Sequence, residues 1–140
     1  MQFGQPMTFR VRATDRPRVI VADDDDDFRD LVSSEVVRLG YDSVQARSSA
    51  DVVSYLAAAL VNPKRYPPAF ALVSDVRMPG QSGLELLASL ANGSYDLPVI
   101  LMTAFGDTDV YAAAARWGAV AILEKPFGVA ELQEALTAAE

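Results

Sequence analysis

The 140-residue sequence contains no cysteine and no histidine. Without cysteine there can be no disulfide, no thiolate nucleophile and no thiolate metal site. Without histidine there can be no Ser-His-Asp triad, no histidine acid–base pair and no zinc site of the usual kind. Chemistry must therefore come from carboxylates, lysine, hydroxyl groups and the backbone. These groups suit a hard cation such as Mg²⁺, which prefers oxygen ligands.

Long apolar runs are also missing, since no stretch approaches the roughly 20 residues that a membrane-spanning helix needs. The 12 basic and 19 acidic residues give a net charge of −7. This balance argues against direct binding to nucleic-acid phosphates, which requires clustered Lys and Arg. We therefore expect a cytoplasmic chain without membrane segments or nucleic-acid contacts of its own.

The first 17 residues contain several arginines but lack the apolar core of a secretory signal. We expect residues 1–17 to form a flexible N-terminal tail, with a docking segment as the alternative. Residues 18–140 are enough for one domain with a proper hydrophobic core.

From residue 18 onward, short β-like runs, of which residues 41–45 are the weakest, alternate with longer segments of helical periodicity. The runs predict strands at 18–22, 41–45, 70–74, 99–102 and 119–123. The periodic segments predict helices at 28–39, 48–60, 82–91, 107–117 and 129–139. Strands that are apolar on both faces and joined by helices imply a parallel sheet covered on both sides. We therefore predict a (βα)5 doubly wound α/β fold of the flavodoxin-like type, with strand order 2-1-3-4-5.

In two of the expected helices the apolar spacing also predicts which side chains face the sheet. The inward residues are expected to be Val52, Val53, Leu56 and Leu60 in the second helix and Val129, Leu132 and Leu136 in the fifth.

Polar residues follow the expected strands where the strands end. Asp23 and Asp24 come after the first strand, and Asp75, Thr103 and Lys125 come after the third, fourth and fifth. In a doubly wound sheet these ends share one rim, beside the point where the strand order reverses. Carboxylates gathered there repel one another unless a cation neutralises them. Mg²⁺ can do so, and it commonly bridges carboxylates to a phosphate.

This set of groups also matches the needs of phosphoryl transfer. A carboxylate beside Mg²⁺ can attack a phosphoryl group and form an aspartyl-phosphate. A lysine and a hydroxyl can stabilise the remaining phosphoryl oxygens. The residues are complete for accepting a phosphoryl group, but a histidine to donate one is missing.

Five aspartates, residues 23–27, stand in a row. We expect Asp25, Asp26 and Asp27 to form a solvated helix start, where acids interact favourably with the helix dipole. A calcium loop of the D-x-D-x-D type is excluded, because its sixth position is Phe28 instead of Gly and its twelfth is Ser34 instead of Glu.

Taken together, four motifs resemble the receiver domain of bacterial response regulators. They are DD at 23–24, DVRMPGQSG at 75–83, TA at 103–104 and KPF at 125–127. The resemblance covers about residues 18–140. The stretches MTAFGD and LEKPF are most similar to receivers of regulators that carry DNA-binding output domains.

The resemblance implies a role for each acid. Asp75 would be the phosphoacceptor. Asp23 and Asp24 would hold Mg²⁺ together with Asp75, and Arg77 would add its backbone carbonyl.

The resemblance also implies how the signal is passed on. Thr103 would hydrogen-bond a phosphoryl oxygen, and Lys125 would pair with the phosphoryl group or, before transfer, with Asp75. The Lys125-Pro126 peptide bond would be cis. The family usually has an aromatic switch residue three positions before the lysine, but this position is Ile122 here. A branched aliphatic side chain can pack inward but cannot swing a ring, so Ile122 lacks the group that the aromatic form of the switch uses.

The function implied is a signalling phosphoacceptor that catalyses only its own phosphorylation and dephosphorylation. Its partner would be a sensor histidine kinase or a phosphotransfer protein. Phosphorylation would change the face formed by residues 107–139 and control an output such as transcription, with a homodimer through that face as a further expectation. Two alternatives stay open. One is a degenerate receiver that acts as an interaction module, suggested by Ile122. The other is a Mg²⁺-dependent aspartyl phosphohydrolase, although residues 23–27 lack the Thr or Val of the usual D-x-D-x-[TV] motif.

Overall fold

The structure is a computed structural model that describes residues 16–93, 95–104 and 106–140. Residues 1–15 of the expected tail lie outside this range. The strands are β1 (Arg18–Ala22), β2 (Asp42–Ala46), β3 (Ala69–Asp75), β4 (Val99–Thr103) and β5 (Ala121–Glu124). The helices are α1 (Asp26–Arg38), α2 (Ser49–Val61), α3 (Gly83–Asn92), α4 (Thr108–Arg116) and α5 (Val129–Ala139).

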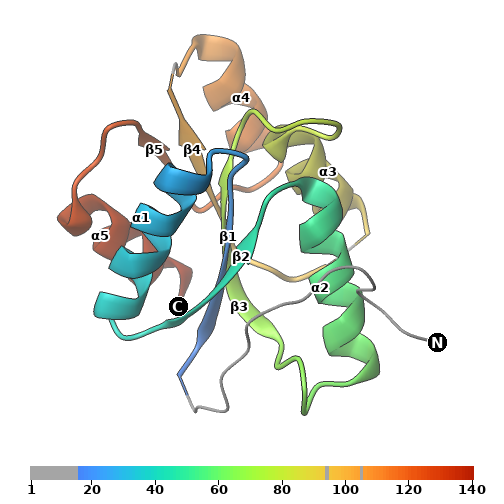
Figure 1. Ribbon diagram of the computed structural model, residues 1–140. Coiled ribbons are helices and arrows are strands. Elements are labelled where there is room, and N and C mark those ends of the chain that lie inside the picture. The colour runs from blue at the N-terminus through green and yellow to red at the C-terminus, as the bar shows by residue number, and fades with distance from the viewer. Residues whose placement is uncertain (1–15, 94, 105) are drawn as a thin grey trace.

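All the strands pair in parallel, in the order β2-β1-β3-β4-β5. The predicted fold class is therefore confirmed. Two hydrophobic clusters lie on opposite faces of the sheet, one beneath α1 and α5 and the other beneath α2, α3 and α4 (Figure 1). Both faces are covered, which explains why the central strands β1, β3 and β4 are largely apolar instead of alternating.

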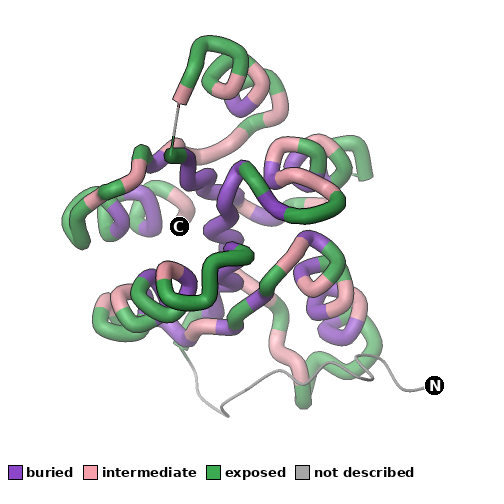
Figure 2. The backbone as a smooth tube through the Cα atoms, turned by 45° about the horizontal axis from the view of Figure 1, so that its top comes forward, coloured by how far each residue is buried: buried purple, intermediate pink, exposed green. Residues whose placement is uncertain are grey.

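The central strands are the most deeply buried part of the chain (Figure 2). Every residue of β1 and β4 is buried, and β3 is buried from Ala71 to Asp75. The two edge strands, β2 and β5, are only partly covered. Because the central strands cannot move without disturbing both layers, the residues at their carboxyl ends stand on a rigid base.

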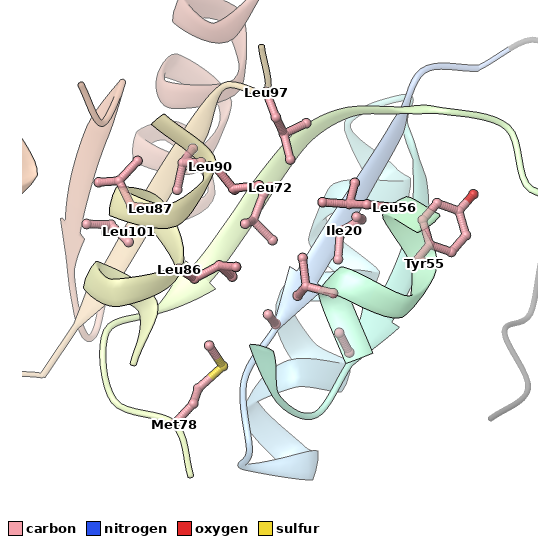
Figure 3. Packing of buried hydrophobic residues seen from close by; sticks show 14 of the residues in the cluster. Ile20, Tyr55, Leu56, Leu72, Met78, Leu86, Leu87, Leu90, Leu97 and Leu101 are labelled. Atoms are coloured by element: carbon pink, nitrogen blue, oxygen red, sulfur yellow. The ribbon is translucent and has the colours of Figure 1, made fainter. Parts of the chain in front are cut away.

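Leucines from the sheet and from α3 fill the core on the α2 and α3 side (Figure 3). Leu72 and Leu101 project from β3 and β4 and are fully buried, and Leu86 of α3 packs in the same cluster. Burying one such side chain contributes about 1.5–3 kcal/mol. The start of α3 is fixed by a capping box, in which Ser82 and Glu85 each accept the other's backbone N–H.

The prediction of which α2 residues face the sheet is right for two residues and wrong for two. Val52 and Leu56 are buried, but the side chains of Val53 and Leu60 are 50% and 73% exposed. The sheet-facing stripe includes Tyr55, which is fully buried and whose hydroxyl donates to the carbonyl of Pro67 at 2.6 Å. Because α2 is apolar on nearly every side, hydropathy alone could not identify its inner face.

A similar error affects one residue of α5. Leu132 and Leu136 are buried as predicted, whereas Val129, the first residue of the helix, is 42% exposed.

Among the described residues, no helix has the length and hydropathy to cross a membrane.

Candidate functional site

Three carboxylates meet at the carboxyl ends of β1 and β3. Asp23 and Asp24 directly follow β1, and Asp75 is the last residue of β3, the neighbouring strand. One oxygen from each acid lies within 4.8 Å of the others. Asp23 and Asp75 are buried, whereas Asp24 is exposed. Three oxygen donors so close together fit a hard divalent cation, as predicted from the strand ends.

Lys125, just beyond β5, is bound to two of these acids. Its Nζ atom lies 2.9 Å from Oδ2 of Asp23 and 3.1 Å from Oδ1 of Asp75. One ammonium among three carboxylates leaves two negative charges in excess (−3 + 1 = −2). The cluster therefore remains attractive to a cation even with the lysine in place.

The two neighbouring acids after β1 differ in how far they are already engaged. Asp23 accepts the Lys125 ammonium on Oδ2 and the backbone N–H of Asp25 on Oδ1, the latter at 2.9 Å. Asp24 is exposed at the same rim. Asp24 is thus the acid more open to an incoming ion.

Thr103 ends β4 and is buried at the same rim. Its backbone carbonyl accepts the N–H of Lys125 at 2.8 Å, which ties the lysine to the end of β4. Arg77 lies two residues beyond Asp75 and is exposed. The Lys125-Pro126 bond is cis, as the resemblance implied.

Ile122 does not lie at the rim. It stands opposite Leu101 in the β4–β5 register and packs, partly buried, against the cluster beneath α2, α3 and α4. On the outer side of α4, Tyr111 is partly exposed, and its hydroxyl donates to the carboxylate of Glu124 at the end of β5. Phe105, the phenylalanine of the MTAFGD stretch, lies outside the described residues.

An aromatic ring completes the environment of the lysine. Phe28, in the first turn of α1, places its ring 4.2 Å from Nζ of Lys125, and Phe127 packs edge-on against it at 5.9 Å. A cation over a ring gains about 0.5–2 kcal/mol, depending on how dry the contact is. Sequence reasoning assigned Phe28 only to the helical spacing of α1, because residues 28 and 125 meet only through the tertiary fold.

The rest of the aspartate run begins α1 as predicted. Asp25 caps the helix by accepting the N–H of Phe28 at 3.1 Å. Asp26 and Asp27 occupy the first turn and are exposed. Asp26 also pairs with Arg29 of the same helix at 2.7 Å.

Burial raises the pKa of Asp75 above its ordinary value of 3.8, and the charges of Asp23 and Asp24 raise it further, against an opposing effect of Lys125. Burial lowers the pKa of Lys125, but its hydrogen bond to Asp23 and the charge of Asp75 outweigh this, so the net pKa is raised. Without a cation, ionisation of Asp75 is thus less favourable in the folded chain than in the unfolded chain.

We expect Asp75→Asn to stabilise the chain at neutral pH in metal-free buffer. Below pH 3.8 the carboxyl is protonated in the folded and the unfolded chain, so its ionisation costs nothing. As the pH rises from 3.8 towards the raised folded pKa, the unfolded chain ionises first and the wild type loses stability, whereas Asn does not ionise. Urea unfolding at several pH values measures the difference. An equal change for the exposed acid in Asp96→Asn, or a gain that persists below pH 3.8, would contradict this expectation.

The sequence of the chain matches a known protein family over most of its length. The family model described as the response regulator receiver domain matches residues 19–137. The chain belongs to the response regulator receiver family.

Relatives of this receiver domain include DNA-binding regulators. The DNA-binding transcriptional regulator NtrC of Escherichia coli is 34% identical over 113 residues, which are 81% of this chain and 22% of the relative. The transcriptional regulatory protein FixJ of Azorhizobium caulinodans is 37% identical over 120 residues, which are 86% of this chain and 53% of the relative. The receiver domain thus spans about a fifth to a half of these two relatives.

Solved structures agree with the fold. FixJ-N superimposes with a TM-score of 0.76 at 27% identity, covering 90% of this chain and 94% of the other. The Vibrio cholerae chemotaxis protein CheY4 gives a TM-score of 0.75 at 24% identity, with 89% and 99% covered, and shows the shared fold alone. The chain is therefore a receiver domain, a signalling module of two-component response regulators.

Proposed function

We propose that this receiver domain accepts a phosphoryl group on Asp75 in a Mg²⁺-dependent reaction. The donor is a phosphohistidine on a sensor histidine kinase or a phosphotransfer protein. The observation that carries the proposal is the group of three carboxylate oxygens within 4.8 Å, with the Lys125 ammonium bound to two of these acids. A site of this composition suits positioning and charge stabilisation, on which phosphoryl transfer mainly depends.

The metal would be held by Asp24, Asp23 and Asp75, with the backbone carbonyl of Arg77. When bound, Mg²⁺ supplies positive charge to the phosphoryl oxygens and to the acids around it. The openness of Asp24 supports a direct ligand role for it, whereas Asp23 is already engaged with Lys125 and the backbone.

The residues of the chain would divide the remaining work. A carboxylate oxygen of Asp75 forms the new bond to phosphorus while the bond from phosphorus to the donor's imidazole nitrogen breaks. The Lys125 ammonium, held beside Asp75 at 3.1 Å, pairs with the transferred group. The hydroxyl of Thr103, at the neighbouring strand end, donates to a phosphoryl oxygen. The chain acts on itself and releases no product from another substrate.

The change would be read on the face of α4, β5 and α5. Phosphorylation would shift a two-state equilibrium through Thr103, with Ile122 packing where the family usually has a ring. Exposed side chains on α4, including Tyr111, Ala112 and Ala115, lie on this face. A homodimer through this face, a transcriptional output and a cytoplasmic location are parts of the proposal that rest on the family and the relatives.

Incubation with Mg²⁺ and a small phosphodonor tests the reaction, because the intact mass should increase by one phosphoryl group and EDTA should prevent the increase. If the protein shows no binding response to Mg²⁺ or to a beryllofluoride phosphate mimic, this would instead favour a degenerate receiver that acts as an interaction module. Ile122 suggests this alternative. Continuous release of phosphate from small esters would favour the phosphohydrolase.

We expect Asp24→Ala to weaken Mg²⁺ binding by at least roughly tenfold, because loss of a ligand should exceed the effect of losing an outer-shell partner. The matched control is Asp27→Ala, which removes the same charge from the exposed first turn of α1 and should barely change Mg²⁺ binding. Amide chemical shifts in an NMR titration with Mg²⁺ measure the binding. Equal losses in the two variants would show that only overall charge matters.

A further inference from the structure

Arg29 of α1 is a buried charged residue at the edge of the acidic site. Its side chain is only 9% exposed. A guanidinium is tolerated in such a place only when its N–H groups find acceptors. Arg29 is anchored on the first turns of α1, so the acceptors it selects connect that helix to its surroundings.

The guanidinium donates to groups from three separate segments. Nη1 donates to the backbone carbonyl of Asp23 at 2.9 Å, and Nε donates to Oε1 of Gln45 in β2 at 2.8 Å. Nη2 donates to Oδ1 of Asp26 at 2.7 Å. The planar guanidinium is well suited to hold several acceptors in a fixed arrangement.

The hydrogen bond to Asp23 links Arg29 to the acidic site, because the Asp23 carbonyl belongs to the peptide unit that joins Asp23 to Asp24. Peptide units are planar, so holding this carbonyl fixes the plane from which both acids extend. The preceding peptide unit is fixed as well, since the N–H of Asp23 donates to the carbonyl of Ala46 at 3.1 Å. The backbone of Asp23 is thus held on both sides.

Arg29 is better suited to hold the backbone of Asp23 in place than to add positive charge to the site. A positive charge by itself would oppose an incoming cation, but Arg29 is already paired with Asp26. Its contact with the Asp23 carbonyl is buried, whereas the side chain of Asp26 is 73% exposed and such a pair contributes little.

We propose that Arg29 is a positioning residue that holds the Asp23–Asp24 peptide unit in the orientation needed for Mg²⁺ binding, with Gln45 orienting the guanidinium. This inference rests on the proposed function, because it concerns the same acidic site. Groups that orient metal ligands typically change metal affinity by about 10–100-fold when removed.

The experiment compares Arg29→Gln with Arg18→Gln in the full chain. Arg18 is a matched control, because it is also a buried arginine but lies at the end of β1 away from the acidic site, where its Nη2 is 3.9 Å from Oδ2 of Asp42. Urea unfolding measures stability, and an NMR titration with Mg²⁺ alone measures affinity in the folded protein. We expect both variants to lose stability, but only Arg29→Gln to lose roughly tenfold in Mg²⁺ affinity.

Two milder variants keep the test decisive if Arg29→Gln does not fold. Arg29→Lys keeps the charge but cannot reproduce the fork of donors, and Gln45→Ala removes one acceptor while leaving the arginine. Both should bind Mg²⁺ more weakly than the wild type, and Arg29→Lys should lose more affinity than Gln45→Ala.

Mg²⁺ affinity within about twofold of wild type in all the folded Arg29 and Gln45 variants would overturn the inference, because such small changes lie far below the effect of a positioning group. A wild-type chain that fails to bind Mg²⁺ at all would instead overturn the proposed function. The two failures are therefore distinguishable.

Discussion

Asp75→Asn is expected to abolish phosphoryl uptake. The amide is nearly the same shape as the carboxylate but lacks the negative oxygen that attacks phosphorus. Because Asp75 lies at the end of the buried strand β3 with Lys125 at 3.1 Å, the substitution removes the proposed nucleophile with little change of shape. Intact mass after incubation with Mg²⁺ and a small phosphodonor should show the added phosphoryl group in the wild type and none in the variant.

The matched control is Asp27→Asn, which makes the same chemical change at an exposed acid in the first turn of α1. It should take up a phosphoryl group as the wild type does. An adduct of unchanged yield in Asp75→Asn would place the modification on another residue. Urea unfolding of the variant, in parallel, excludes loss of the fold as the cause.

The second large effect is expected for Gly83→Ala. Gly83 begins α3, and its N–H donates to the carbonyl of Val76 at 2.8 Å. A Cβ atom at this position would overlap the backbone oxygen of Asp75 and lie 3.1 Å from Cα of Val76. These are backbone atoms of the last residue of β3 and of the residue that follows it, so they cannot move aside as a flexible side chain could.

We expect Gly83→Ala to lower the free energy of unfolding by about 2 kcal/mol. Overpacking costs typically about 1–3 kcal/mol, and contact with backbone places this site at the upper end. The better helix propensity of Ala offsets at most about 1 kcal/mol. Phosphoryl uptake should also slow, because relief of the overlap would displace the backbone of Asp75.

Urea denaturation measures this loss, and Gly93→Ala is the matched control. At Gly93, a Cβ atom would lie 3.3 Å from the Ser89 carbonyl at the end of α3, and the backbone φ of −80° suits alanine. The control should change stability by only a few tenths of a kcal/mol. Similar losses of unfolding free energy at both positions would contradict the expectation, because they would show that the overlap with the Asp75 backbone costs little.

We expect the carboxylate of Asp75 to lower the stability of the fold at neutral pH, because it is buried beside two other acids. Asp75 shows the conflict most clearly, since burial and two neighbouring acids raise its pKa while Lys125 opposes them. A chain selected only for stability would place a neutral residue there. Functional sites commonly retain such unfavourable arrangements.

Much of this architecture follows from the order of residues along the chain. The largely apolar runs of β1 and β4 predicted a sheet covered on both faces, and the acids at 23, 24 and 75 stand at the ends of two strands that the doubly wound order makes neighbours. These inferences depend on local periodicity and on a topology that few alternatives can satisfy. The convergence of the three acids is a consequence of that topology.

The inner face of α2 illustrates what local pattern could not decide. Val53 and Leu60 are as apolar as Val52 and Leu56, yet they are exposed. Hydropathy identifies an inner face only when the outer face is polar, and α2 has apolar residues on both. Which side packs inward depended on the fit of Tyr55 and Leu56 against the sheet.

By itself, the sequence determined the fold class, the strand order and the acids, hydroxyl and lysine at the strand ends, because these depend on periodicity and on the position of residues relative to strands. Only the tertiary structure decided that Phe28 covers Lys125 and that Arg29 holds the peptide unit between Asp23 and Asp24. It also decided that Gly83 lies against the backbone of Asp75. Each of these contacts depends on side-chain direction and on distances of a few ångströms between packed elements, which spacing along the chain does not specify.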